Sequence, residues 1–154
     1  MKKQNSIKKK KIIHNPEEVK YTKQHKGCLT GLEYKASSIR LVYGLFGLKI
    51  LTANRFRVKQ LETVRKQVSG QLKKNQFLWI RITPDIPVTR KPKEIRMGKG
   101  KGLVSEWVVK MKPGHILLEL SAMTYRKAFM ILNQAAKKLA VPTAIVFQKE
   151  KLIF

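Results

Sequence analysis

The sequence predicts an α+β fold in which a mostly antiparallel sheet carries two helices packed on one face. Two stretches have a helical period of 3.6 residues, and short apolar runs typical of strands are interleaved with them. The chain of 154 residues has the length of one domain and contains no internal repeat. We therefore expect a basic N-terminal extension over residues 1–20 and a single domain over residues 21–154.

The first predicted elements are a strand and a helix. The apolar run LFGLKIL, residues 45–51, has the length of a strand. In RVKQLETVRKQVSGQLKK, residues 57–74, the period changes to 3.6 and one apolar stripe appears. A separate face of this helix repeats a lysine every seven residues, at Lys59, Lys66 and Lys73. Such a face is often ordinary solvated surface, but in so basic a chain we expect it to contact phosphates.

Three strands are predicted in the middle of the chain. FLWIRIT, residues 77–83, is rich in aromatic and β-branched residues, and its Trp79 is expected to pack in the core rather than to stack on a base. EWVVKMK, residues 106–112, is predicted as the second of them. The KPGH turn after it leads into ILLEL, residues 116–120, which predicts a hairpin of these two strands.

A second helix and a last strand complete the predicted domain. TYRKAFMILNQAAKKL, residues 124–139, begins with Thr124 as the predicted N-cap. VPT ends this helix, and AIVF, residues 144–147, supplies the final strand. The apolar face of the helix is predicted to consist of Tyr125, Ala128, Phe129, Leu132, Ala135, Ala136 and Leu139.

The charge of the chain indicates an anionic partner. It has 34 lysines and arginines against 9 acids, a formal net charge of +25. A compact state with that charge repels itself unless its surroundings are densely anionic, and nucleic acid is the commonest such surrounding. A membrane surface is the alternative, but no apolar run approaches the roughly 20 residues that a spanning helix needs. We therefore expect binding to nucleic acid and no membrane span.

Side chains for catalysis or metal binding are sparse. The chain has one cysteine, Cys28, which excludes an internal disulfide, and its three histidines lack metal-ligand spacing. Carboxylates are few and dispersed, and no nucleophile sits beside a candidate base. We therefore predict no catalytic residue, no metal and no cofactor, which argues against an RNA-modifying enzyme.

A long loop is predicted over residues 84–105, which have no period of their own. Loops of this length in a compact domain are usually functional or disordered. Prolines stiffen its outgoing arm, whereas three glycines alternate with lysines in GKGKG, residues 98–102. That spacing fits neither the dinucleotide nor the phosphate-loop fingerprint, so we expect a projecting, flexible cationic loop that grips the backbone of folded RNA. Its predicted cationic contacts are Arg90, Lys91, Lys93, Arg96, Lys99 and Lys101.

The same segment resembles a known family. WIRITPDIPVTRKPKEIRMGKGKG, followed by EWVVKMKPGHILLEL, is similar to the signature of the universal large-subunit ribosomal protein L-sixteen family. The proline-spaced arm, the RMGKGKG tip and the tryptophan of the next strand occur together and in order. KYTKQHKG, residues 20–27, resembles the family's basic segment, and QLETVRKQ resembles its first helix. The resemblance covers residues 21–147.

The resemblance implies a structural, rRNA-binding protein of the large ribosomal subunit and not an enzyme. Its implied partners are large-subunit rRNA and neighbouring ribosomal proteins, with tRNA as a further candidate, because the family's loop points toward the tRNA-accepting and peptidyl-transfer region. A basic nucleic-acid-binding protein outside the ribosome, either a DNA-compacting protein or an RNA chaperone, is the alternative. The rRNA contacts carried over by direct match are Arg96, Met97, Gly98, Lys99, Gly100, Lys101 and Gly102 in the loop. In the segment that resembles the family's basic segment, the predicted rRNA contacts are Lys23, His25 and Lys26.

Three features depart from the family pattern or narrow its subgroup. Arg57 stands where the family's first helix usually has a threonine or serine cap, and an arginine cannot accept the unpaired N–H bonds, which puts the first turn in doubt. The lysine-rich extension is longer than in typical bacterial members, and VSGQLKKN, residues 68–75, is closer to mitochondrial relatives. We therefore predict a mitochondrial ribosome in the matrix, with the bacterial cytoplasm and the plastid stroma as alternatives.

Overall fold

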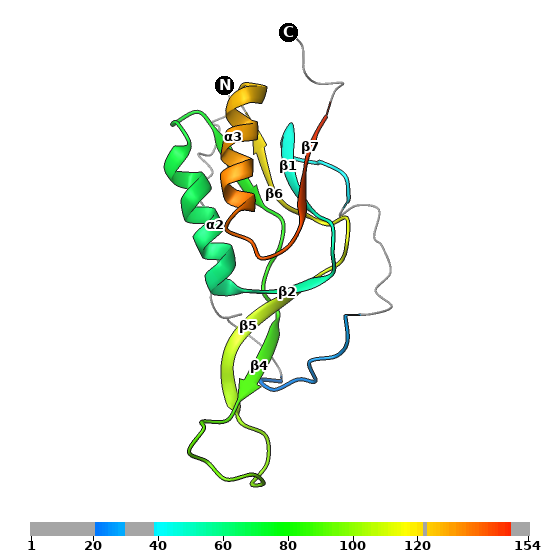
Figure 1. Cartoon of the computed structure of the whole chain (residues 1–154), viewed down its shortest axis with the longest axis vertical. Coiled ribbons are helices and arrows are strands. Elements are labelled where there is room, and N and C mark those ends of the chain that lie inside the picture. Colours follow the sequence, from blue (N-terminus) through cyan, green and yellow to red (C-terminus); the bar gives the residue numbers. More distant parts are fainter. Residues whose placement is uncertain (1–20, 30–38, 122, 149–154) are drawn as a thin grey trace, which may run out of the picture.

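The structure, a computed structural model, describes residues 21–29, 39–121 and 123–148. The predicted extension over residues 1–20 lies outside these ranges. Within them the chain forms two antiparallel sheets and two helices, which confirms the predicted α+β class (Figure 1). The elements are β1 (Phe46–Ile50), β2 (Asn54–Arg57), α2 (Val58–Gln71), β3 (Phe77–Ile80), β4 (Ile86–Arg90), β5 (Leu103–Met111), β6 (Ile116–Ser121), α3 (Tyr125–Ala136) and β7 (Thr143–Phe147).

The larger sheet and both helices form the main body of the molecule. The sheet has four strands in the order β3–β6–β1–β7, and all neighbours are antiparallel. Helices α2 and α3 lie side by side on one face of it (Figure 1). Buried residues of the helices, such as Val64 and Leu132, join Leu48 and Leu120 of the sheet in one core. The prediction of two helices on one face is thus confirmed for this sheet.

The smaller sheet has three strands in the order β2–β5–β4, where the sequence predicts one sheet only. β5 pairs with β2 and β4, whereas β6 pairs with β1 and β3, so the predicted hairpin of β5 with β6 is wrong. The KPGH turn instead carries the chain from one sheet to the other, and its Gly114 N–H donates to the Ile50 carbonyl at 2.6 Å. Turn residues mark a change of direction, but they do not determine which strand each flanking segment pairs with.

The predicted loop over residues 84–105 is partly a hairpin. β4 pairs along its whole length with β5, and only residues 91–102 are left to connect the two strands. β4 contains Pro87, which cannot donate to a neighbouring strand and is tolerated because β4 lies at the edge of its sheet. Because Pro87 argues against a strand, the sequence predicts a loop where β4 lies.

Helix α2 begins at Val58, although the residue before it cannot cap it. Arg57 occupies the N-cap position with extended backbone, and its own N–H donates to the side-chain oxygen of Gln60 at 3.0 Å. That bond is one half of a capping box and fixes the entrance to the helix. The first turn, which the sequence analysis puts in doubt, is present.

Helix α3 begins as predicted with Thr124 at the N-cap position, although its side chain makes no capping bond. The buried face differs from the prediction, because Ile131 is buried whereas Tyr125 and Phe129 are 45% and 44% exposed. Tyr125 stacks on Phe129 and meets Phe147 of β7 edge-on, with ring centroids 5.5 Å apart. These rings lie at the margin of the core, a position that helical period alone does not reveal.

A buried carboxylate holds the segment before β1 against the sheet. Glu119 of β6 is fully buried and pairs with the Arg81 guanidinium at 2.8 Å. Its oxygens also accept N–H bonds from Val42, Tyr43 and Gly44, the shortest at 2.7 Å. Charge-assisted bonds of this kind satisfy the buried carboxylate and fix the backbone that enters β1.

Trp79 packs on the outer face of the four-stranded sheet. It lies opposite Glu119 in the pairing of β3 with β6, whereas its neighbours Leu78 and Ile80 face the core. Its ring is 6.1 Å from that of Tyr43, and the side chain is half-buried. The predicted place of Trp79 in the core is therefore wrong, because the alternation of the strand turns it away from the helices.

Candidate nucleic-acid interface

The hairpin of β4 and β5 ends in a loop that stands away from both helices (Figure 1). We call residues 91–102 the cationic finger. Met97, near its tip, is 99% exposed, and Glu94 is the single acid of the finger. Lys91 and Gly102, at its base, are half-buried. The other predicted loop contacts are exposed, namely Arg90, Lys93, Arg96, Met97, Gly98, Lys99, Gly100 and Lys101.

The backbone of the finger explains its glycines. Gly98, Lys99 and Gly100 have positive φ angles of +93°, +52° and +77°. Glycine adopts this region without the strain that a side chain causes. At the base of the finger, a Cβ on Gly102 would lie 2.7 Å from the carbonyl oxygen of Arg90. The tip therefore requires glycine for its turn, and the base requires it for the close approach of the two strands.

The basic segment over residues 21–29 is held against the finger. Lys23 Nζ donates to the Lys101 carbonyl at 3.2 Å, and Lys101 Nζ donates to the Gln24 carbonyl at 2.8 Å. These reciprocal bonds join two segments that are 77 and 78 positions apart in the sequence. The three contacts predicted in this segment are all exposed, namely Lys23, His25 and Lys26. Finger and segment thus form one cationic surface.

The three lysines predicted on the first helix are exposed, but Lys73 lies just beyond the end of α2 and only Lys59 is gathered at this surface. Lys59 lies at the start of the helix and lines a pocket together with residues of segment 21–29 and β5. Lys66 and Lys73 follow farther along the chain, in the direction in which the helix leads away from the finger (Figure 1). The structure therefore joins Lys59 to the finger surface and does not bring Lys66 and Lys73 there.

Several acids are neutralised by arginines. Glu62 of α2 is buried and bonded to Arg65 at 2.9 Å, and this hydrogen bond raises the pKa of the Arg65 guanidinium above its usual value. Glu119 is buried in an arginine pair of its own. Glu106 of β5 contacts Arg57 at 3.2 Å. Of these three acids only Glu106 lines the pocket beside the finger, and together with Glu94 it is outnumbered by the exposed lysines of this surface.

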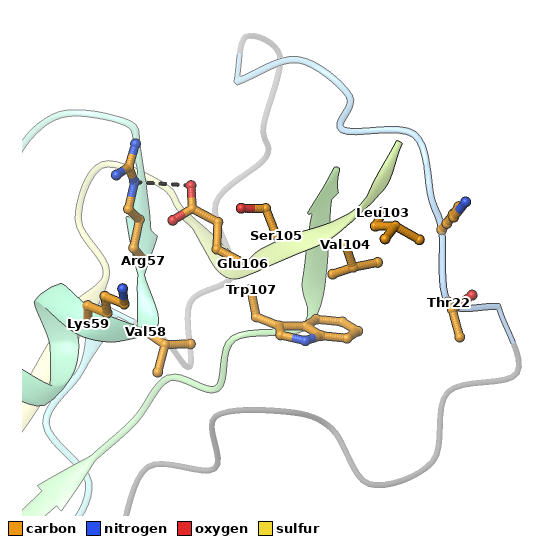
Figure 2. Close-up of a pocket in the computed structure, with 10 residues that line it drawn as sticks. Thr22, Arg57, Val58, Lys59, Leu103, Val104, Ser105, Glu106 and Trp107 are labelled. Carbon is orange, nitrogen blue, oxygen red and sulfur yellow. Dashed lines mark ion pairs between the residues drawn. The ribbon is translucent and has the colours of Figure 1, made fainter. Parts of the chain in front are cut away.

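The pocket lies between segment 21–29, the start of α2 and β5, and its volume is about 590 Å³ (Figure 2). Val104 and the indole of Trp107 lie on the same side of β5, and Glu106 reaches Arg57 from the other side (Figure 2). The pocket cannot be recognised in the sequence, because its walls come from separate segments and no local pattern indicates it. It is lined by Thr22, Lys23, Arg57, Val58, Lys59, Leu103, Val104, Ser105, Glu106 and Trp107.

Neither a metal site nor a membrane-crossing helix is found in the described part of the chain. Its histidines, cysteine and acids form no group of three or more that could hold a metal ion. Over residues 21–29, 39–121 and 123–148, no helix has both the length and the apolar character needed to cross a membrane. What the described residues offer a ligand is a cationic surface and a partly apolar pocket.

Known proteins resemble this chain along most of its length. The family model described as "Ribosomal protein L16p/L10e" matches residues 16–146. The chain belongs to this family. The "Large ribosomal subunit protein uL16" of Psychrobacter arcticus is 44% identical over 131 residues, which cover 85% of this chain and 94% of that protein. The protein of the same name from Cereibacter sphaeroides is 42% identical over 135 residues, which cover 88% of this chain and 97% of that protein. The one from Buchnera aphidicola is 41% identical over 131 residues, which cover 85% of this chain and 94% of that protein.

Membership in the L16p/L10e family confirms the main functional prediction. The chain is a ribosomal protein of the large subunit and not an enzyme. The matched range contains the cationic finger, segment 21–29 and α2. The relatives named above are bacterial and give no support to a mitochondrial ribosome.

Proposed function

We propose that this protein, as a structural constituent of the large ribosomal subunit, binds large-subunit rRNA through the cationic finger and segment 21–29. The observation that carries the proposal is a pair of hydrogen bonds, from Lys23 to the Lys101 carbonyl and from Lys101 to the Gln24 carbonyl, which joins two basic segments into one exposed surface. Lysines of such a surface contact phosphates and so position a protein on RNA without reading its bases. Membership in the L16p/L10e family supports the same conclusion.

The shape of the finger suits RNA that is already folded. Apart from the glycines and their chain neighbours, no atom of the described residues lies within 4 Å of the place where a Cβ on Gly98 or Gly100 would stand. Met97, near the tip of the loop, is almost fully exposed. A thin loop of this kind can enter between RNA helices, where its cations contact phosphates on either side. The finger would therefore hold neighbouring parts of rRNA together.

The place of the finger in the ribosome is a further part of the proposal. We propose that it supports the tRNA-accepting and peptidyl-transferase region and the assembly of the subunit, with tRNA and neighbouring ribosomal proteins as additional partners. The support is the match of residues 96–102 to the family's glycine-rich loop and the position of the finger at the end of the molecule away from the helices (Figure 1).

For the compartment we propose a mitochondrial ribosome in the matrix. Support comes from the long, lysine-rich stretch over residues 1–20 and from VSGQLKKN, which resembles mitochondrial members of the family. Fractionation of the source cells tests this proposal, and the protein is expected to purify with mitochondrial large subunits. Recovery from a bacterial cytoplasm or a plastid stroma would contradict it and leave the rRNA-binding proposal intact.

Sedimentation tests the rRNA-binding proposal. A tagged full-length chain should migrate with large subunits through a sucrose gradient at moderate salt, because many simultaneous phosphate contacts hold it there. Recovery with the nucleoid would instead support a DNA-compacting protein. Recovery with free RNA and without particles would support an RNA chaperone.

A further inference from the structure

We propose that the outer face of the four-stranded sheet forms a second RNA contact, in which an unpaired base of rRNA stacks on the ring of Tyr43. We call Tyr43, Phe77 and Trp79 the aromatic platform. The inference rests on the proposed rRNA binding and deepens it, because the platform belongs to the main body of the molecule and not to the cationic finger. Proteins bind single-stranded RNA largely by stacking its unpaired bases on aromatic side chains.

The three rings of the platform lie against one another, and two of them are open to solvent. The Trp79 ring is centred 6.1 Å from that of Tyr43, with 22° between the two planes, and 5.8 Å from that of Phe77, with 34°. Tyr43 is 61% exposed and Phe77 is 43% exposed. Because Trp79 covers one face of the Tyr43 ring and the residue is still mostly exposed, the other face is accessible. A base on that face would extend a stack that already exists.

A buried carboxylate holds the platform in place. The N–H of Tyr43 donates to Glu119 at 2.7 Å, and Trp79 lies opposite Glu119 in the pairing of β3 with β6. A Cβ on Gly44 would lie 2.5 Å from the carbonyl oxygen of Leu120, so the backbone that follows Tyr43 is packed closely on β6. A ring on such a rigid support loses little conformational freedom when a ligand binds, which favours affinity.

The charges around the platform favour RNA over a protein as its ligand. Tyr43 belongs to segment 39–45, and Phe77 directly follows segment 72–76. Neither segment contains an acid, and both carry exposed cations, namely Arg40, Lys73 and Lys74. Sites for single-stranded RNA combine cations, which contact the phosphates, with aromatic faces, on which the bases stack.

The platform and the finger are separate contacts. The loop that leads from α2 into β3 lies at the end of the body opposite to the finger (Figure 1). It contains Lys73, a predicted rRNA contact that the structure does not bring to the finger surface. The proposal gives this lysine a phosphate near the platform, and one protein chain would hold two stretches of rRNA.

The first test changes the RNA and leaves the protein intact. Hexauridylate and a fully abasic hexanucleotide have the same phosphate backbone, so the charge of the protein attracts both equally. The full chain should bind hexauridylate about fivefold or more tightly, because base stacking on an aromatic side chain contributes that much or more. Equal affinities, or no binding of hexauridylate at low salt, would overturn the proposal.

A second test changes the ring of Tyr43. The variant Tyr43→Leu keeps an apolar side chain over Trp79 but lacks a flat face, so it should bind the two hexanucleotides alike. The variant Tyr43→Phe keeps the ring and should keep the preference for hexauridylate. A preference that persists in Tyr43→Leu, or that is lost in Tyr43→Phe, would refute stacking on this side chain.

Tyr125 supplies a matched control. It is 45% exposed and stacks on Phe129, but it lies on α3 and outside the platform. The variant Tyr125→Leu should change the affinity for hexauridylate by less than about twofold, because the platform stays intact. A loss equal to that of Tyr43→Leu would show that exposed aromatic side chains act without regard to their place in the fold.

Tryptophan emission tests the site with Tyr43 unaltered. The chain has two tryptophans, so Trp107→Phe leaves Trp79 as the reporter beside Tyr43. Its emission should change on addition of hexauridylate and stay constant with the abasic hexanucleotide. Constant emission at saturating hexauridylate would contradict the proposal.

A photoreactive side chain distinguishes RNA from a protein partner inside the ribosome. With p-azidophenylalanine in place of Tyr43, irradiation of assembled large subunits should cross-link this protein to rRNA. Cross-links to a neighbouring ribosomal protein alone, or no cross-link to rRNA, would overturn the proposal.

Failure of the platform and failure of the proposed function are distinguishable. Binding to a large-subunit rRNA fragment is measured in parallel as a function of salt. If that binding is strong and salt-dependent while hexauridylate and the abasic hexanucleotide bind alike, the platform proposal alone is wrong. If the full chain does not bind the rRNA fragment at low salt, the proposed function itself is contradicted.

Discussion

Glu119 shows how one side chain can determine the position of a whole segment. Its carboxylate pairs with Arg81 and accepts N–H bonds from three successive residues, and none of it is exposed. Glu119→Ala removes the charge that compensates Arg81, so we expect a loss of about 3–5 kcal/mol in the free energy of unfolding. Urea denaturation of the free protein measures this loss.

The control for Glu119 is the more exposed ion pair of Arg57 with Glu106. The two side chains are 62% and 31% exposed, so solvent screens their attraction and Glu106→Ala should cost at most about 1 kcal/mol. If the two alanine variants lost equal stability, burial would not be what makes the Glu119 pair important.

Leu132 tests the core of the helical face in the same way. It is fully buried in α3, and Leu132→Ala should cost roughly 2–5 kcal/mol through lost burial and the cavity left behind. Met130 lies in the same helix and is 61% exposed, so Met130→Ala should stay within about 0.5 kcal/mol of the parent. Thermal unfolding measures the stability of both variants. A small loss of stability in Leu132→Ala would contradict the assignment of Leu132 to the core.

At the scale of elements, the cationic finger should separate function from stability. Gly98→Val combined with Gly100→Val places β-branched side chains at positive φ, which strains the tip. Because none of the described residues beyond their chain neighbours approaches a Cβ at these positions, the loop can relax without disturbing the fold, and the free variant should melt near the parent temperature. Large subunits that contain it should assemble late or translate poorly. Unfolding of the free variant, or normal particle yield and peptide synthesis, would refute the role of the finger.

The elements also show what the sequence could and could not reveal. Helices α2 and α3 and strand β1 follow from local period and composition. Strand β4 was hidden because Pro87 argues against a strand unless its edge position is known, and the partner of β5 depends on residues far away in the chain. The glycines indicated the finger correctly, because glycine is favoured where the backbone turns with a positive φ or where two segments approach closely.

The site was predictable to a similar degree. The finger and segment 21–29 were found through their basic composition and family resemblance, but only the fold shows that Lys23 donates to the Lys101 carbonyl and Lys101 to the Gln24 carbonyl. Trp107 lies in a segment that was predicted as a strand, and its place in a pocket depends on how β5 lies relative to two other segments. Local sequence patterns do not reveal such contacts between segments that are far apart in the chain.

At the scale of the whole molecule, the net charge of +25 should make RNA binding strongly dependent on salt. If about 6–10 phosphates are neutralised, raising salt from about 50 to 200 mM should weaken binding by ~10³ to 10⁵-fold, because condensed counterions are released on association. Filter binding of structured RNA at several salt concentrations measures the slope. A nearly flat dependence would show that the lysines do not contact phosphates.

The most direct test of the central claim is hydroxyl-radical probing from the finger inside the ribosome. Cys28→Ser removes the one cysteine, after which Lys99→Cys carries a tethered iron chelate at the tip, and Arg126→Cys carries it in the first turn of α3 as a control. We predict strong, discrete cleavage of large-subunit rRNA from position 99, at sites that differ from those of position 126. Absence of rRNA cleavage from position 99, in particles that contain the protein, would contradict the account.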